Sequence, residues 1–140
     1  MAEKEKALTL MQFLLDNPVN NEREEVVVSQ RFKDAGFTFT ISAMSGEQFS
    51  SYQKQATAVG RHKKVNFDSK LFNELVVINH TLNPNFKDTE AVKQAGCASP
   101  EQFMYKVLKA GEIIELSNKI SVLSGFDSEL DDMVDEVKNS

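Results

Sequence analysis

The chain has 140 residues, a mass of 15.7 kDa and a formal net charge of −5 at pH 7. This length fits one domain over residues 1–140, and a hydrophobic share of 41% excludes the composition of a disordered chain. The negative charge and a pI near 5.1 argue against nucleic acid as a partner, because Lys and Arg contacts to phosphate supply most nonspecific affinity.

The N-terminal part predicts one helix and two strands. Apolar residues recur at helical spacing as far as Leu15, and Asn17-Pro18 ends the pattern, so we expect a short amphipathic helix. Residues 24–29 contain three consecutive valines, and residues 37–42 alternate apolar and polar side chains. Both stretches predict strands, and a turn over residues 33–36 would join them into an antiparallel hairpin.

The middle of the chain predicts helices around a polar loop. Ser45, with a glutamine three residues later, has the pattern of a helix-capping box. Residues 59–66 are polar, contain a basic tetrad and are interpreted as a loop. Asp68 can cap the next element, in which residues 75–78 fit either a helix or a buried strand.

Two helices separated by a tight turn are predicted next. The first begins at Asp88 or Thr89 and ends at Gly96, and Ser99-Pro100 supplies an N-cap hydroxyl and a first-turn proline for the second. This layout is that of a helix-turn-helix, so a small DNA-binding regulator is one alternative function. Glu101 argues against it, because this carboxylate lies in the first turn of the helix that would contact DNA.

The sequence that follows, up to Gly125, predicts a helix. Apolar residues repeat at helical intervals from Ile113 to Leu123, in a helix that either continues through Gly111 or restarts there, and Ser124-Gly125 ends it. Together these elements predict an α+β fold with a small antiparallel hairpin in the N-terminal half and a mostly helical C-terminal half.

Residues 127–140 predict a final amphipathic helix that either packs on the domain or detaches from it. Its polar positions are mostly carboxylates, which would be repelled by an anionic membrane, so a groove or helix on a protein is the partner that suits it. We predict that its apolar stripe binds a partner, and that Arg31 and Phe32 on the hairpin side form the second candidate surface. The stripe consists of Leu130, Met133, Val134 and Val137.

The cysteine content and the N-terminus indicate a cytoplasmic protein. Cys97 is the single cysteine, which suits a reducing compartment. Glu3 and Glu5 offset the positive charge that a secretion signal needs, and residues 16–18 differ from a cleavage site. No stretch approaches the roughly 20 apolar residues that span a bilayer, so we expect no membrane partner.

The sequence contains no recognisable arrangement of catalytic or metal-binding residues. His62, His80 and Cys97 are far apart in the chain, and none has a second ligand at a metal-binding interval. There is no phosphate-binding glycine loop and no nucleophile elbow. We therefore predict no enzymatic activity, no catalytic residue, no metal and no cofactor.

Several segments between Ser29 and the C-terminus match the pattern of a known family. They are Ser29-Gln30-Arg31-Phe32-Lys33-Asp34, Asn83-Pro84-Asn85-Phe86-Lys87-Asp88, Leu108-Lys109-Ala110-Gly111-Glu112 with Leu116 following, and Val137-Lys138-Asn139. On these segments the chain resembles the XkdN-like tail assembly chaperones of long-tailed bacteriophages and phage-derived tail particles.

The resemblance implies a protein that binds the tape measure protein, a long, largely helical and aggregation-prone chain. Such a chaperone keeps its client soluble until the tail tube polymerises around it, and it is absent from the finished particle. The resemblance also implies a possible contact with the tail tube protein, through a longer frameshifted product. A structural tail or baseplate component is the alternative. From the amphipathic helices themselves we expect weak homo-oligomer formation when no client is present.

Overall fold

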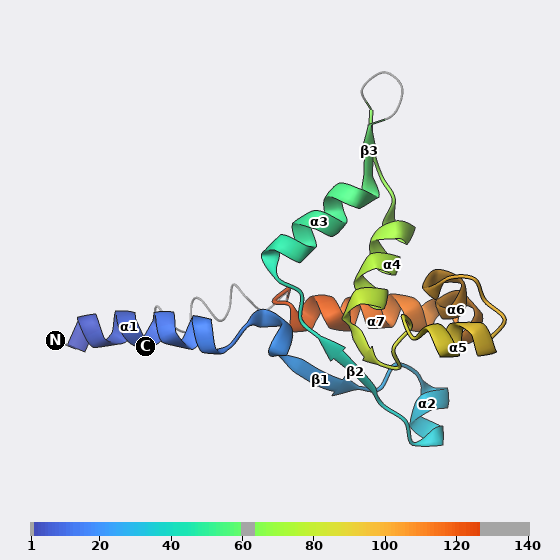
Figure 1. The fold of residues 1–140 in the computed structure, drawn as a ribbon, viewed down its shortest axis with the longest axis horizontal. Coiled ribbons are helices and arrows are strands. Elements are labelled where there is room, and N and C mark those ends of the chain that lie inside the picture. Colours follow the sequence, from blue (N-terminus) through green and yellow to red (C-terminus); the bar gives the residue numbers. More distant parts are fainter. Residues whose placement is uncertain (1, 60–63, 127–140) are drawn as a thin grey trace.

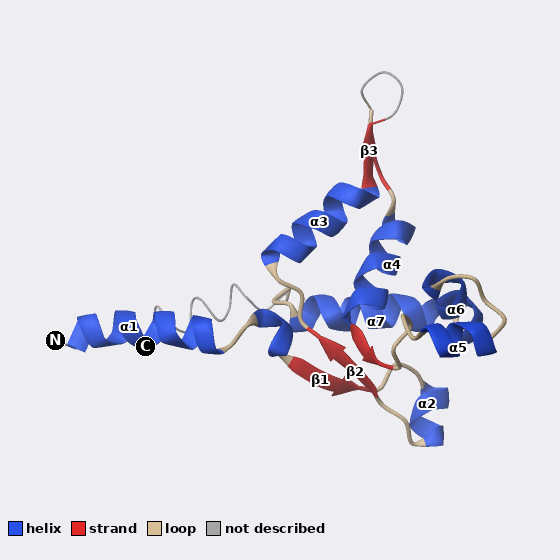
Figure 2. Ribbon diagram, viewed as in Figure 1, coloured by secondary structure: helices blue, strands red, loops and turns tan. Residues whose placement is uncertain are grey.

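The computed structural model describes residues 2–59 and 64–126. Within these ranges the chain has the predicted α+β fold (Figure 1 and Figure 2). Most of the described residues are helical, and the strands form two small antiparallel sheets. No helix in this part of the chain combines the length and the apolar character needed to cross a membrane. The predicted acidic helix over 127–140 lies outside the described residues.

The larger sheet contains the predicted hairpin. β1 (Arg23–Val26) pairs antiparallel with β2 (Phe39–Ser42), with Val26 opposite Phe39. Val26, Phe39 and Ile41 of these strands are buried in the core. The strands are shorter than the predicted stretches 24–29 and 37–42, and Val27 and Phe37 lie outside them and are exposed. A third strand, β5 (Thr81–Asn83), pairs with the other edge of β2 and was not foreseen.

The predicted turn between these strands is wrong, because a short helix, α2 (Gln30–Ala35), occupies the connection. Strand pairing stops at Val26 and Phe39, which leaves enough chain for a helix. Gly36 ends α2 in the left-handed conformation, at φ 79°, and its N–H donates to the Phe32 and Lys33 carbonyls.

The predicted loop at residues 59–66 is also partly wrong. β3 (Thr57–Val59) and β4 (Val65–Phe67) form a two-stranded antiparallel arm, with Thr57 opposite Phe67. This arm extends from the ends of α3 (Gly46–Ala56) and α4 (Ser69–His80), as Figure 1 shows. The two helices lie side by side and bring the short strands together.

The helix caps agree with the sequence predictions. Ser45 and Asp68 accept hydrogen bonds from the backbone of Gln48 and Leu71 and so begin α3 and α4. Residues 75–78 lie inside α4, which settles the choice between helix and strand in favour of helix.

Three helices complete the C-terminal half. α5 (Thr89–Gln94) and α6 (Pro100–Val107) begin at the caps Asp88 and Ser99. α7 (Ala110–Leu123) is a new helix, because Leu108 has an extended backbone and interrupts the helical run.

The core lies where α7 packs against α4 and the larger sheet. Its fully buried side chains come from β2, α4, α6, α7 and the segment after β5, so segments distant in sequence share one hydrophobic cluster. They are Ile41, Val76, Val77, Phe86, Met104, Leu116 and Ile120.

The predicted N-terminal helix is present as α1 (Ala2–Asp16). It extends away from the rest of the fold and is joined to β1 through a 3-10 turn, η1 (Val19–Asn21) (Figure 1). This placement separates α1 from the core.

Candidate partner-binding site

The apolar side chains of α1 are uncovered. Side chains of this helix are described from Thr9 to Asp16, and all of them are exposed. Five are large and apolar, and Leu14, for example, is 57% exposed. They are Leu10, Met11, Phe13, Leu14 and Leu15.

These side chains define an amphipathic helix. At 3.6 residues per turn, Leu10, Met11, Leu14 and Leu15 lie within an arc of about 140°, and Phe13 flanks it. Gln12 and Asp16 lie on the opposite side, where Gln12 Nε2 donates to Asp16 Oδ1 at 2.7 Å. The five apolar residues are named below as the α1 face.

An isolated helix of this length is only marginally stable in water, and helices in proteins gain most of their stability from packing. Fully burying a large apolar side chain contributes roughly 1.5–3 kcal/mol, so covering the exposed part of each α1 face side chain would contribute about 1 kcal/mol. Covering the α1 face would therefore stabilise α1.

A crevice of about 410 Å³ lies at the base of α1, where its last turn meets η1. Phe13, Leu14, Pro18 and Val19 supply its apolar lining, and Glu22 is among its polar lining residues. We call this crevice the notch. It continues the α1 face, because Phe13 and Leu14 belong to both.

Hydrogen bonds fix the direction in which α1 leaves the domain. The Asn17 backbone N–H and side-chain amide both donate to the Phe13 carbonyl, at 3.0 and 2.9 Å. The Asn20 amide donates to the Ala43 carbonyl at 2.9 Å and to Gln48 Oε1 at 2.8 Å, which attaches η1 to α3 and to the residue that follows β2. The base of α1 is thus held in place while its apolar face stays open.

The chain around the notch is acidic. Residues 9–29 contain four carboxylates and one cation, Arg23. Within the described residues, none of the four carboxylates takes part in an ion pair. They are Asp16, Glu22, Glu24 and Glu25.

The two surfaces singled out by sequence have different outcomes. Leu130, Met133, Val134 and Val137 lie outside the described residues, so partner binding by this stripe stays a prediction. Arg31 and Phe32 belong to α2, and their side chains are engaged within the chain.

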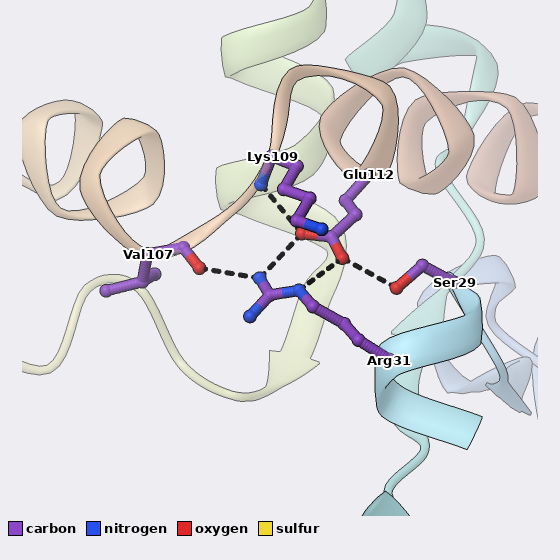
Figure 3. A network of polar contacts seen from close by, with 5 residues as sticks. All are labelled: Ser29, Arg31, Val107, Lys109 and Glu112. Carbon is purple, nitrogen blue, oxygen red and sulfur yellow. Dashed lines mark hydrogen bonds and ion pairs between the residues drawn. The ribbon is translucent and has the colours of Figure 1, made fainter. Parts of the chain in front are cut away.

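Arg31 is clamped to Glu112 at the start of α7 (Figure 3). Arg31 Nε and Nη2 donate to the two carboxylate oxygens of Glu112 at 2.7 Å each, and Nη2 also donates to the Val107 carbonyl at 3.0 Å. Such a bidentate pair fixes the relative orientation of two elements. α2 is thereby tied to the first turn of α7.

Glu112 is the centre of this network and is only 3% exposed. Besides Arg31, it accepts hydrogen bonds from Ser29 Oγ at 2.6 Å and from the Lys109 backbone N–H at 2.7 Å, as Figure 3 shows. The hydrogen bonds from Arg31, above all, lower the pKa of Glu112 to about 2. The carboxylate is therefore charged and fully satisfied.

Phe32 completes the anchoring of α2. Its ring packs edge-on against Phe39 with centroids 4.8 Å apart, and the Arg31 guanidinium lies 4.4 Å from its centroid. Partner binding by Arg31 and Phe32 stays a prediction, but the contacts described for them are intramolecular. Two of the segments that carry the family resemblance, 29–34 and 108–112, meet in this network.

A buried polar cluster surrounds His80. Its Nε2 lies 2.8 Å from the Tyr52 hydroxyl, and its Nδ1 lies 3.4 Å from Ser42 Oγ. Burial, and then the nearby charge of Lys87, lower the pKa of His80 to about 4. At neutral pH this histidine is an uncharged hydrogen-bonding group of the core, out of reach of a substrate.

The described residues contain no group of three or more His, Cys, Asp or Glu side chains placed to hold a metal ion. The α5–α6 pair has the order of a helix-turn-helix, but its first turns carry Glu90 and Glu101. Lys106 Nζ donates to the Ala95 carbonyl and closes the turn between these helices. These features do not favour contacts with phosphate.

The described residues thus leave one large apolar helical surface, the α1 face, uncovered. A family model described as phage XkdN-like tail assembly chaperone protein matches residues 10–138. The chain therefore belongs to the XkdN-like phage tail assembly chaperone family, which confirms the resemblance found in the sequence.

Individual relatives agree with this family. The chain is 30% identical to the uncharacterized protein YqbN of Bacillus subtilis, over 99% of this chain and 100% of YqbN. It is 27% identical to the phage-like element PBSX protein XkdN of Bacillus subtilis, over 99% of this chain and 100% of that protein. The crystal structure of YqbN is similar, with a TM-score of 0.60 and 26% identity over 76% of this chain and 87% of YqbN.

Proposed function

We propose that this chaperone binds the tape measure protein of its phage tail and keeps it soluble until the tail tube polymerises around it. It acts in the host cytoplasm by binding alone, without catalysis, and leaves before the particle is complete. The observation that carries the proposal is the α1 face, an apolar helical surface held open at the edge of a packed domain.

The physical properties of chaperone and client fit this role. A long helical client exposes apolar stripes, and an open apolar helix covers such a stripe by packing along it. The net charge of −5 keeps the resulting complex soluble. Many copies, each bound weakly along one client, would hold it firmly and still be displaced one by one during tube assembly.

The remaining contacts are predictions of the sequence. The stripe Leu130, Met133, Val134 and Val137 is a second candidate for client binding. The tail tube protein is a possible further partner. Weak self-association in the absence of the client follows from the same apolar surfaces.

Co-expression with the tape measure protein of the same phage tail tests the proposal. The wild-type chain should raise the soluble fraction of the client and be recovered with it, whereas Leu14→Gln should lose this effect. Ile114→Gln is the matched control, because Ile114 is also an exposed helical side chain, 53% exposed, on α7. Met133→Lys tests the C-terminal stripe in the same assay.

A client that stays insoluble with the wild-type chain would contradict the proposal. Mature particles provide the second measurement, since a structural tail component remains in them and a chaperone does not. Recovery of stoichiometric amounts of this chain from purified tails would favour the structural alternative.

A further inference from the structure

The chain around the notch, at the base of the α1 face, is acidic, and this indicates the chemistry of what covers it. We infer that the α1 face and the notch bind an amphipathic helix with basic edges, one large apolar side chain of which fills the notch. The inference rests on the proposed function and identifies the kind of client segment.

The shape of the site indicates a helix. The part of α1 whose side chains are described, residues 9–16, extends about 12 Å, so the α1 face offers about two turns against which another helix can pack ridge into groove. The notch of about 410 Å³ closes one end of this surface and is open to a side chain of the partner. A helix lying along α1 would thus find a continuous apolar track with a pocket that sets its register.

The charges indicate basic edges. Asp16 lies on the polar side of α1, and Glu22 lines the notch. Glu24 and Glu25 follow on the exposed edge strand β1, and Arg23 is the single cation among residues 9–29. Lys or Arg beside the apolar stripe of a partner would be attracted by the negative charge that these carboxylates give to the base of α1, which speeds association and selects the partner.

The same charges disfavour a second copy of this chain as the occupant. A pair formed through α1 would combine two copies that each carry a net charge of −5, and neither copy supplies an excess of Lys or Arg. Self-association through this face is therefore expected to be weaker than binding of a basic helix.

Two synthetic peptides of about 20 residues, long enough to form a helix, test the inference. They share one leucine stripe and differ only in the flanking residues, which are Lys in one and Glu in the other. In titrations with the full chain at low salt, the Lys peptide should bind at least about tenfold more tightly than the Glu peptide. This preference should shrink as the salt concentration rises.

Variants of the chain separate the apolar and the charged contributions. Leu14→Gln should weaken binding of the Lys peptide by about tenfold. The control Ile114→Gln should leave the affinity for this peptide within about twofold of wild type. The double variant Asp16→Asn with Glu22→Gln should reduce the preference for the Lys peptide.

Asp34→Asn is the matched charge control. Asp34 accepts a hydrogen bond from Gln30 four residues earlier on α2, as Asp16 does from Gln12 on α1. This variant should keep the full preference for the Lys peptide, because Asp34 lies outside residues 9–29.

Equal binding of the two peptides would overturn the inference, as would unchanged binding of the Lys peptide by Leu14→Gln. A stable dimer of the wild-type chain that Leu14→Gln converts to a monomer would overturn it too, in favour of a second copy. If no peptide binds but the chain still keeps the tape measure protein soluble, the inference fails and the proposed function stands. If the client is not kept soluble, the proposed function itself fails.

Discussion

α1 and α7 are helices of similar length, 15 and 14 residues, and both carry repeated apolar side chains. In α7 the stripe of Ile113, Leu116 and Ile120 is buried against α4 and the larger sheet. In α1 every described side chain is exposed. The comparison shows that an apolar helical pattern favours burial of its side chains but does not specify whether they are buried by the same chain.

The difference begins at the helix ends. The first turn of α7 is joined to α2 by the Arg31–Glu112 network, which holds the start of α7 in contact with α2. The end of α1 is fixed by Asn17 and Asn20, which set its direction but leave its sides open. α1 is therefore held at its base, while the side chains along its length stay uncovered.

The largest expected effect on the free energy of unfolding comes from a substitution in α7. Leu116 is fully buried, at 0% exposure, so Leu116→Ala should lower the free energy of unfolding by about 3 kcal/mol. Leu14→Ala on α1 should change it by less than about 0.5 kcal/mol. Urea denaturation followed by circular dichroism measures both, and equal losses would show that α1 is packed in solution.

Loss of the clamp on α7 should have the next largest effect. Glu112→Gln leaves Arg31 without its charged partner, and because Arg31 is 42% exposed we expect a loss of about 2 kcal/mol, below that of a fully buried pair. The control is Glu115→Gln in the same helix, whose exposed pair with Lys119 is worth less than about 0.5 kcal/mol. Similar losses in the two variants would contradict a structural role of the network.

The clamp also has a pH signature. The pKa of Glu112 lies at about 2 in the folded chain and at 4.5 in the unfolded chain. The unfolded state therefore binds more protons between these values, so this stabilisation is complete above pH 4.5 and is lost as the pH falls toward 2. The stability of Glu112→Gln should fall less steeply than that of wild type in this window.

His80 gives a smaller and separate pH dependence. Its pKa is lowered from 6.5 to about 4, so the unfolded state binds the extra proton, and stability falls as the pH decreases from 6.5 toward 4. Between pH 7 and pH 5 we expect a loss of about 1–2 kcal/mol, measured by urea denaturation. His80→Asn should be less stable at pH 7 but should lack this slope, and an unchanged slope would refute the assignment.

Local signals explain what could be predicted from the sequence. The caps at Ser45, Asp68, Asp88 and Ser99 bond to backbone amides two or three residues away, so a short sequence window contains the whole interaction. The hairpin β1–β2 was predicted from the three consecutive valines in residues 24–29 and from the alternation in residues 37–42.

Long-range contacts explain what could not be predicted. β5 pairs with β2 across about 40 residues, and β3 and β4 are three-residue strands that meet because α3 and α4 lie side by side. Arg31 was singled out, but its partner is 81 residues away in the chain. Similarly, the amphipathic pattern of α1 was visible, whereas its exposure follows from where the core lies.

The smallest effect on stability, paired with a large effect on binding, is expected from removing α1 itself. Deleting residues 1–16 removes no described side chain from the core and leaves the bonds from Asn20 to Ala43 and Gln48 in place. The free energy of unfolding should therefore stay within about 0.5 kcal/mol of wild type, since terminal elements contribute least to global stability. The shortened chain should nevertheless fail to keep the tape measure protein in solution, because the α1 face is gone. A loss of stability comparable to that of Leu116→Ala would instead place α1 with α7 among the elements that hold the domain together, and the client surface would have to lie elsewhere.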